Sequence, residues 1–110
     1  MSPKPAPYAP TAYIAICKDG PNGAAGRASA IREHFAYIEK VLGDLNIAGP
    51  LFGADGKTMV GSLYCFQTNN IDTARALLEG DPYFRAGIFA SVEYFPHLPA
   101  AGKFIGGKIW

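Results

Sequence analysis

The strand-like segment at residues 59–67 (MVGSLYCFQ) constrains the fold more than any other part of the chain. Alternate residues of a strand point to opposite faces of a sheet, and here both series are apolar: Val60, Tyr64 and Phe66 in one, Met59, Leu63 and Cys65 in the other. A sheet with helices on one face and water on the other would show polar residues in one series. Both faces of this strand must therefore be covered.

The remaining segments supply the elements of one small domain, as expected for 110 residues. Apolar, strand-like runs occur at 13–18, 47–52, 59–67 and 91–95, and helical patterns occupy 28–45 and 71–79. The order βαββαβ predicts an α+β fold of the ferredoxin-like type. Its four-stranded antiparallel sheet would carry the helices on one face.

The long helix is predicted from an apolar stripe with steps of three and four residues, formed by Ala28, Ile31, Phe35, Ile38, Leu42 and Leu45. We expect this helix to begin between 24 and 28, to end near 46–49, and to turn the stripe toward the core.

Capping residues and prolines indicate where the later elements begin and end. Asn69 or Asn70 is expected to cap the second helix, and Asp81 followed by Pro82 is typical of another short helix, through about residue 86. Pro50 lacks an amide donor and predicts an edge or a bulge for its strand. Pro96 is expected to end the last strand.

Helices on one side cannot cover both apolar faces. The first strand repeats the pattern, with Ile14 and Ile16 facing opposite to Ala15 and Cys17. A second copy that stacks its sheet on the first would bury the remaining face. The sequence therefore predicts a homodimer through the open sheet face, in a barrel-like arrangement.

Charge and composition exclude several classes of partner. The net charge is +1 with no cluster of Lys or Arg, which disfavours nucleic acid and anionic membrane surfaces. No segment approaches the roughly 20 apolar residues of a membrane helix. Residues 1–11, with four prolines in the first ten positions, are expected to form an extended arm rather than a signal peptide.

Cys17 and Cys65 show no metal-binding or redox spacing, so we expect buried, reduced thiols and a cytoplasmic location. With only two histidines and no acidic cluster, no metal site is predicted.

His34 is the first candidate for chemistry, because it lies beside the apolar stripe at the expected margin between helix and sheet. A histidine there can act as general acid or base, or can be an ordinary boundary residue. Arg27, on the same row of the helix, could bind an anion or be solvated. Asp81 could be a helix cap or could orient a histidine. Ser62 and Tyr83 could offer hydroxyl groups to a ligand.

These residues occur together with other motifs: Gly49-Pro50, Gly61-Ser62, Asp81-Pro82-Tyr83, Ala86-Gly87-Ile88 and VEYFP at 92–96. Over residues 12–97 the chain resembles the YCII-related family, and 98–110 form a tail outside the usual pattern. Where family members often carry Arg-Pro-x-His, this chain reads AIREH at 30–34. One arginine of the family pattern is therefore absent or displaced by one residue.

The resemblance implies a ferredoxin-like subunit of a dimeric α+β barrel, with a site around His34 and Asp81 between the first helix and the sheet. It also implies small aromatic or lactone-type substrates, including dehydrochlorination. An acid–base mechanism at this site would need no cofactor. The first hypothesis is thus an isomerase, lyase or dehydrochlorinase-like enzyme in which Asp81 fixes the tautomer of His34. A non-catalytic dimeric metabolite-binding or accessory module is the alternative. A third hypothesis is a haem monooxygenase with His34 or His97 on iron.

Overall fold

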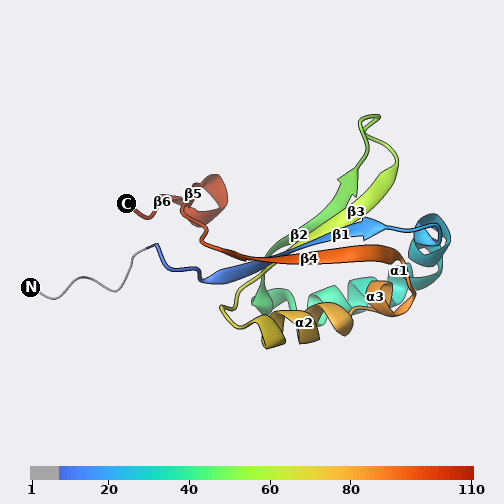
Figure 1. The fold of residues 1–110 in the computed structure, drawn as a ribbon, viewed down its shortest axis with the longest axis horizontal. Coiled ribbons are helices and arrows are strands. Elements are labelled where there is room, and N and C mark those ends of the chain that lie inside the picture. The colour runs from blue at the N-terminus through green and yellow to red at the C-terminus, as the bar shows by residue number, and fades with distance from the viewer. Residues whose placement is uncertain (1–7) are drawn as a thin grey trace, which may run out of the picture.

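The computed structural model describes residues 8–110, and four strands in this range form an antiparallel sheet (Figure 1). The strands are β1 (Ala12–Asp19), β2 (Leu45–Phe52), β3 (Met59–Phe66) and β4 (Phe89–His97), in the spatial order β2-β3-β1-β4. All three neighbouring pairs are antiparallel. Of the expected N-terminal arm, residues 1–7 lie outside the described residues.

Three helices lie on one side of this sheet (Figure 1). They are α1 (Gly23–Lys40), α2 (Ile71–Glu79) and α3 (Pro82–Arg85). The element order and the single layer of helices confirm the predicted ferredoxin-like α+β fold. Within the described residues, no helix is long and apolar enough to cross a membrane.

Local sequence signals account for the starts of the two shorter helices. The Asn70 side chain accepts hydrogen bonds from the backbone amides of Asp72 and Thr73 at 2.8 and 3.1 Å, which satisfies two of the free donors at the start of α2. Asp81 accepts from the amide of Tyr83 at 2.9 Å and Pro82 occupies the first turn of α3.

The predicted end of α1 is wrong. The helix ends at Lys40, a single 3₁₀ turn follows at Leu42–Asp44, and Leu45 already belongs to β2. The stripe also does not face the core as a whole, because Ile31, Phe35 and Leu42 are 41%, 57% and 62% exposed. The buried side of α1 is instead the neighbouring row, which begins with Gly23, Gly26 and Arg27.

The two prolines in strands both lie on edge strands. An edge strand has one side without a neighbouring strand, and a missing amide donor on that side breaks no hydrogen bond of the sheet. Pro50 is in β2, as predicted for an edge. Pro96 does not end the last strand, because β4 runs through it to His97. It pairs with Tyr13 on β1, and β4 is the other edge strand of the sheet.

A bulge between Leu51 and Phe52 changes the register of the β2–β3 pair near the start of β3. Strict alternation predicts Met59 on the face opposite Tyr64, and this is wrong, because both side chains line one pocket on the helix side of the sheet. A shift of one residue reverses the face to which a side chain points.

The core lies between the sheet and the helices. Its buried residues are Ala15, Cys17, Tyr64, Phe66, Ala74 and Leu78. Cys17 and Cys65 are both free and buried, and burial raises the pKa of the Cys17 thiol to about 12, with the nearby Asp81 charge adding to the effect.

Candidate active site

A buried carboxylate organises the centre of the site. Asp81, at the start of α3, is 0% exposed, and both of its oxygens lie near Nδ1 of His34 on α1, at 2.8 and 2.9 Å. The same carboxylate accepts from the Tyr83 amide at 2.9 Å and from the Tyr64 hydroxyl at 2.7 Å. An ionised carboxylate is only an acceptor, so the contact requires the proton of His34 to sit on Nδ1. In the neutral ring, Nε2 then carries the free lone pair.

Tyr64 fixes the carboxylate from the sheet side. Its ring is 3% exposed on β3, and burial together with the Asp81 charge and hydrogen bond raises the pKa of its hydroxyl. The hydroxyl therefore stays protonated and keeps donating to Asp81. Three donors from three elements hold Asp81, which leaves little freedom for the position of His34.

Tyr83 holds the plane of the histidine. Its ring stacks on the imidazole with centroids 3.7 Å apart and planes 3° apart. Burial raises the pKa of the Tyr83 phenol, and the charge of Arg27 partly opposes this. The imidazole is thus fixed both at Nδ1 and on one face, so its remaining nitrogen has one defined direction.

Arg27 forms the second polar part of the site. Its Nε and Nη2 each donate to one oxygen of Asp19 at 2.9 Å, and Nη2 also donates to the Gly61 carbonyl at 2.9 Å and the Ser62 hydroxyl at 3.0 Å. The residue is 7% exposed, so the alternative of a solvated arginine is wrong. The hydrogen bond to Asp19 raises the pKa of Arg27, and the side chain remains a cation.

Gly61 is needed where β3 passes this arginine. A Cβ at Gly61 would collide with the backbone carbonyl of Cys17 on the neighbouring strand. Glycine therefore lets β1 and β3 approach closely while its own carbonyl receives Arg27.

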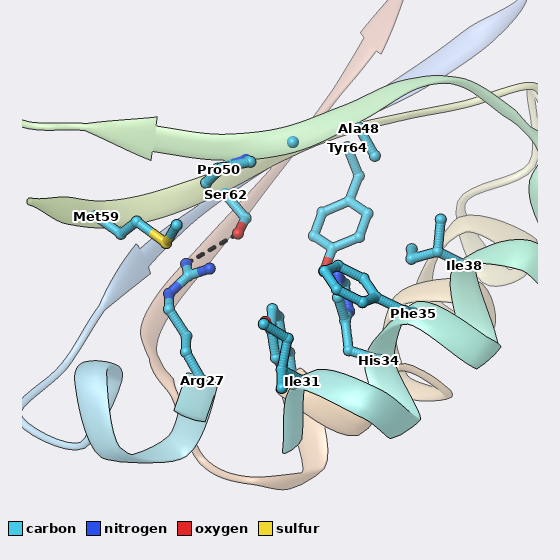
Figure 2. Close-up of a pocket in the computed structure, with 12 residues that line it drawn as sticks. Arg27, Ile31, His34, Phe35, Ile38, Ala48, Pro50, Met59, Ser62 and Tyr64 are labelled. Atoms are coloured by element: carbon cyan, nitrogen blue, oxygen red, sulfur yellow. Dashed lines mark hydrogen bonds between the residues drawn. The ribbon is translucent and has the colours of Figure 1, made fainter. Parts of the chain in front are cut away.

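A pocket of about 300 Å³ opens between α1 and strands β2 and β3 (Figure 2). Arg27 and Ser62 lie at one end of the pocket and His34 and Tyr64 at the other (Figure 2). Tyr83 stacks on His34, and its ring centroid is 5.3 Å from the Arg27 guanidinium carbon. Its apolar walls consist of Ile31, Phe35, Ile38, Ala48, Pro50 and Met59. Ile31 and Phe35, which belong to the exposed part of the helix stripe, thus line the pocket.

This arrangement can remove a proton from a small ligand. A histidine held in this way can act as a base through Nε2, and a buried carboxylate on Nδ1 stabilises the imidazolium that such a step produces. The bonds of Arg27 within the described chain use Nε and Nη2, so Nη1 is the part of the guanidinium available to a ligand oxygen. The apolar walls lower the local dielectric and strengthen these interactions.

All five residues proposed from the sequence meet in this region. His34 and Asp81 are in contact across 47 positions of sequence, and Arg27, Ser62 and Tyr83 line the pocket or hold its groups. His97 lies elsewhere, beside a second hollow at the end of the sheet. No group of three or more potential metal ligands occurs within residues 8–110.

Sequence reasoning missed two residues of the site. Asp19 carries no prediction in the sequence analysis, although its position directly after the predicted strand 13–18 and before Arg27 is a usable signal. Tyr64 was read as a core aromatic residue, and only its hydroxyl distinguishes it from a purely apolar one. Nothing local to either residue indicates its partner.

The fold and the site define a ferredoxin-like domain with a buried carboxylate–histidine pair facing a small pocket. The sequence model of the YCII-related domain matches residues 11–98, and the chain belongs to this family.

The solved structures include a similar protein, the 5-chloro-2-hydroxyhydroquinone dehydrochlorinase TftG from Burkholderia phenoliruptrix AC1100, in complex with 2,5-dihydroxybenzoquinone. The two chains are 28% identical and superpose with a TM-score of 0.69 over 84% of this chain and 96% of that one. No curated protein sequence matches the chain.

Proposed function

We propose that this protein is a small-molecule enzyme that removes a proton from a small aromatic or lactone-like metabolite. His34 is the general base and Asp81 its orienting partner. The observation that carries the proposal is the contact of Nδ1 of His34 with the fully buried Asp81, beside a largely apolar pocket of about 300 Å³. A pocket of this size suits a single-ring ligand better than a large one.

The proposed step is an elimination or isomerisation that needs no cofactor. Nε2 of His34 takes a proton from an acidic C–H or O–H group, and the freed electron pair forms a new double bond. In a dehydrochlorination the C–Cl bond breaks, chloride leaves with its electron pair, and the imidazolium later releases the proton, so the net loss is HCl. Arg27, Ser62 and Tyr83 position the oxygens of the substrate, with Arg27 stabilising negative charge on oxygen.

The similar dehydrochlorinase TftG supports this reaction class, since it acts on a chlorinated hydroxyhydroquinone and its structure holds a quinone. The working form proposed here is a homodimer joined through the open sheet face, acting in the cytoplasm. The apolar residues left on that face by the single helix layer support the dimer.

The proposal is tested by a substrate screen with paired histidine variants. The panel contains chlorinated and non-chlorinated hydroxyquinols and small lactones, with chloride release and ultraviolet spectra as readouts. We expect His34→Gln to lower kcat by about 10²–10⁴-fold, the usual contribution of a general base, while His97→Gln retains activity. Activity retained in His34→Gln would rule out the mechanism. Saturable binding without product in the wild type would favour the binding module.

Asp81→Asn tests the role of the charge separately from that of the ring. The amide can still accept from Nδ1 but cannot stabilise an imidazolium, so we expect kcat to fall by about a hundredfold or more. Nitrogen-15 NMR of the wild type, at a pH where the imidazole of His34 is neutral, should show its proton on Nδ1. A proton on Nε2 would contradict the assignment of the base.

A further inference from the structure

The C-terminal segment 98–110, called the arm below, lies outside the family match except for its first residue, because the match ends at residue 98. It folds into a small hairpin of β5 (Ala101–Gly102) and β6 (Gly107–Lys108), joined by a 3₁₀ turn at Lys103–Ile105. Figure 1 shows this hairpin beyond the end of the main sheet, on the side away from the helices. An isolated two-stranded hairpin is marginally stable in water, so its order needs another surface.

The arm is apolar and exposed. Phe104 is 86% exposed and Trp110 is 63% exposed, while Ile105 and Ile109 are 43% and 48% exposed. Four large apolar side chains in thirteen residues form a patch of the kind that marks an interaction site.

The arm stands off from its own domain. A hollow of about 500 Å³ separates residues 101–105 from the end of the sheet, where Ile47, Cys65 and His97 form its other wall. The arm therefore does not seal this end of its own sheet, and side chains of a partner can enter between the two.

The open sheet face next to the hollow carries an apolar row across all four strands. The strand register aligns Ile47 on β2 with Cys65 on β3, Ile14 on β1 and Phe95 on β4. The two ends of the row, Ile47 and Phe95, are 48% and 49% exposed. The middle of the row is more buried, with Cys65 at 4% exposed. Within residues 8–110, each chain thus has a projecting apolar arm and an apolar row whose two ends are left half exposed.

We infer that the arm clasps a second copy of this chain, with Phe104 and Trp110 packed on the open sheet face of the partner. The inference rests on the proposed homodimer and adds a segment that the family fold lacks. In a dimer with twofold symmetry each contact occurs twice. The arm of each chain can therefore pack on the open sheet face of the other chain, and both arms and both faces are covered in one assembly.

The available area fits this assembly. The six exposed side chains named above carry on the order of 600 Å² per copy, taking roughly 200 Å² for each large side chain and its exposed fraction. The half-buried Ile14, Ile16 and Leu63 add to this area. A standard interface buries about 800 Å² per partner.

Trp110 is the only tryptophan of the chain and reports on the arm directly. In the full-length protein, we expect its fluorescence to be blue-shifted in the dimer and to move to the red on dilution. The midpoint of this shift should equal the dimer dissociation midpoint from analytical ultracentrifugation. Blue emission that persists while ultracentrifugation shows the dimer dissociating would mean that the arm packs on its own subunit. Red emission throughout would mean that it packs on nothing. Either result overturns the inference.

Phe104→Ser in the full-length chain provides the second measurement. This side chain is 86% exposed, so the subunit fold does not depend on it, and we expect dimer dissociation to become at least about tenfold more favourable. Leu42→Ser is the matched control, because Leu42 is 62% exposed but lies outside the arm and the open face. A dimer that is unaffected by Phe104→Ser would refute the arm and leave the sheet-face dimer standing. A chain that is monomeric at all concentrations would refute both.

Discussion

The two faces of the main sheet are formed by the same four strands but carry different kinds of side chain. On the helix side, charged and polar groups are buried and each has a partner, as in the contacts of Asp81 and Arg27. On the open side, the row from Ile47 to Phe95 is apolar, and its two ends are about half exposed. Strand β3 serves both faces, because Ser62 and Tyr64 point to the site while Leu63 and Cys65 point away.

In the proposed function, the helix side of the sheet carries the chemistry and the open side carries the contact between subunits. Polar networks specify one arrangement when all their members are satisfied, and they are costly when one member is lost. Apolar surfaces are less directional and tolerate small changes. Substitutions on the helix side should therefore damage the subunit itself, whereas those on the open side should mainly alter association.

The largest effect is expected when Arg27 is replaced by Met. Asp19 would remain largely buried without its cation, so we expect a loss of about 3–5 kcal/mol in the free energy of unfolding, measured with urea. Arg32→Met is the control, since this exposed arginine on the same helix should change stability by no more than about 0.5 kcal/mol. Equal losses in the two variants would contradict the buried role of Arg27.

A smaller effect on the same face concerns the pH dependence of stability. The pKa of the Cys17 thiol is about 12 in the folded protein and about 9.0 when unfolded. Because the unfolded thiol loses its proton first, stability is fully present below pH 9 and decreases as the pH rises toward 12. Between pH 8 and 10.5 this thiol should remove about 2 kcal/mol.

The measurement compares urea unfolding of the wild type and of Cys17→Ala at several pH values. The tyrosines titrate in both proteins, so comparing the two slopes removes most of their contribution and leaves that of the thiol together with its coupling to Tyr64 and Tyr94. Parallel pH profiles would show that the thiol is not shielded as the structure indicates.

The smallest effect is expected on the open face. Phe95→Thr keeps a residue suited to strands but removes half-exposed apolar area, so we expect dimer dissociation to become about tenfold more favourable, or about 1.4 kcal/mol. Leu42→Ser again serves as control. An unchanged dimer dissociation constant in Phe95→Thr would place the dimer contact away from this row.

Much of the fold could be predicted because its signals are local. The caps at Asn70 and Asp81, the edge proline at Pro50 and the apolar runs each depend on a few neighbouring residues. The end of α1 could not be predicted in this way. The apolar stripe continues through Leu42 and Leu45 beyond the end of the helix. Its middle residues line a pocket, and its last residue, Leu45, already belongs to β2.

The sequence by itself determined the element order and the single helix layer, since periodicity and capping act within a few residues, and it predicts a cover on the second face. Only the tertiary structure decided which groups meet. The contact of His34 with Asp81 and that of Arg27 with Asp19 depend on how α1 packs on the sheet. From the sequence, only the family resemblance predicted the first of these contacts. The face of Met59 was decided by a bulge, because one shifted residue in a strand exchanges its two sides.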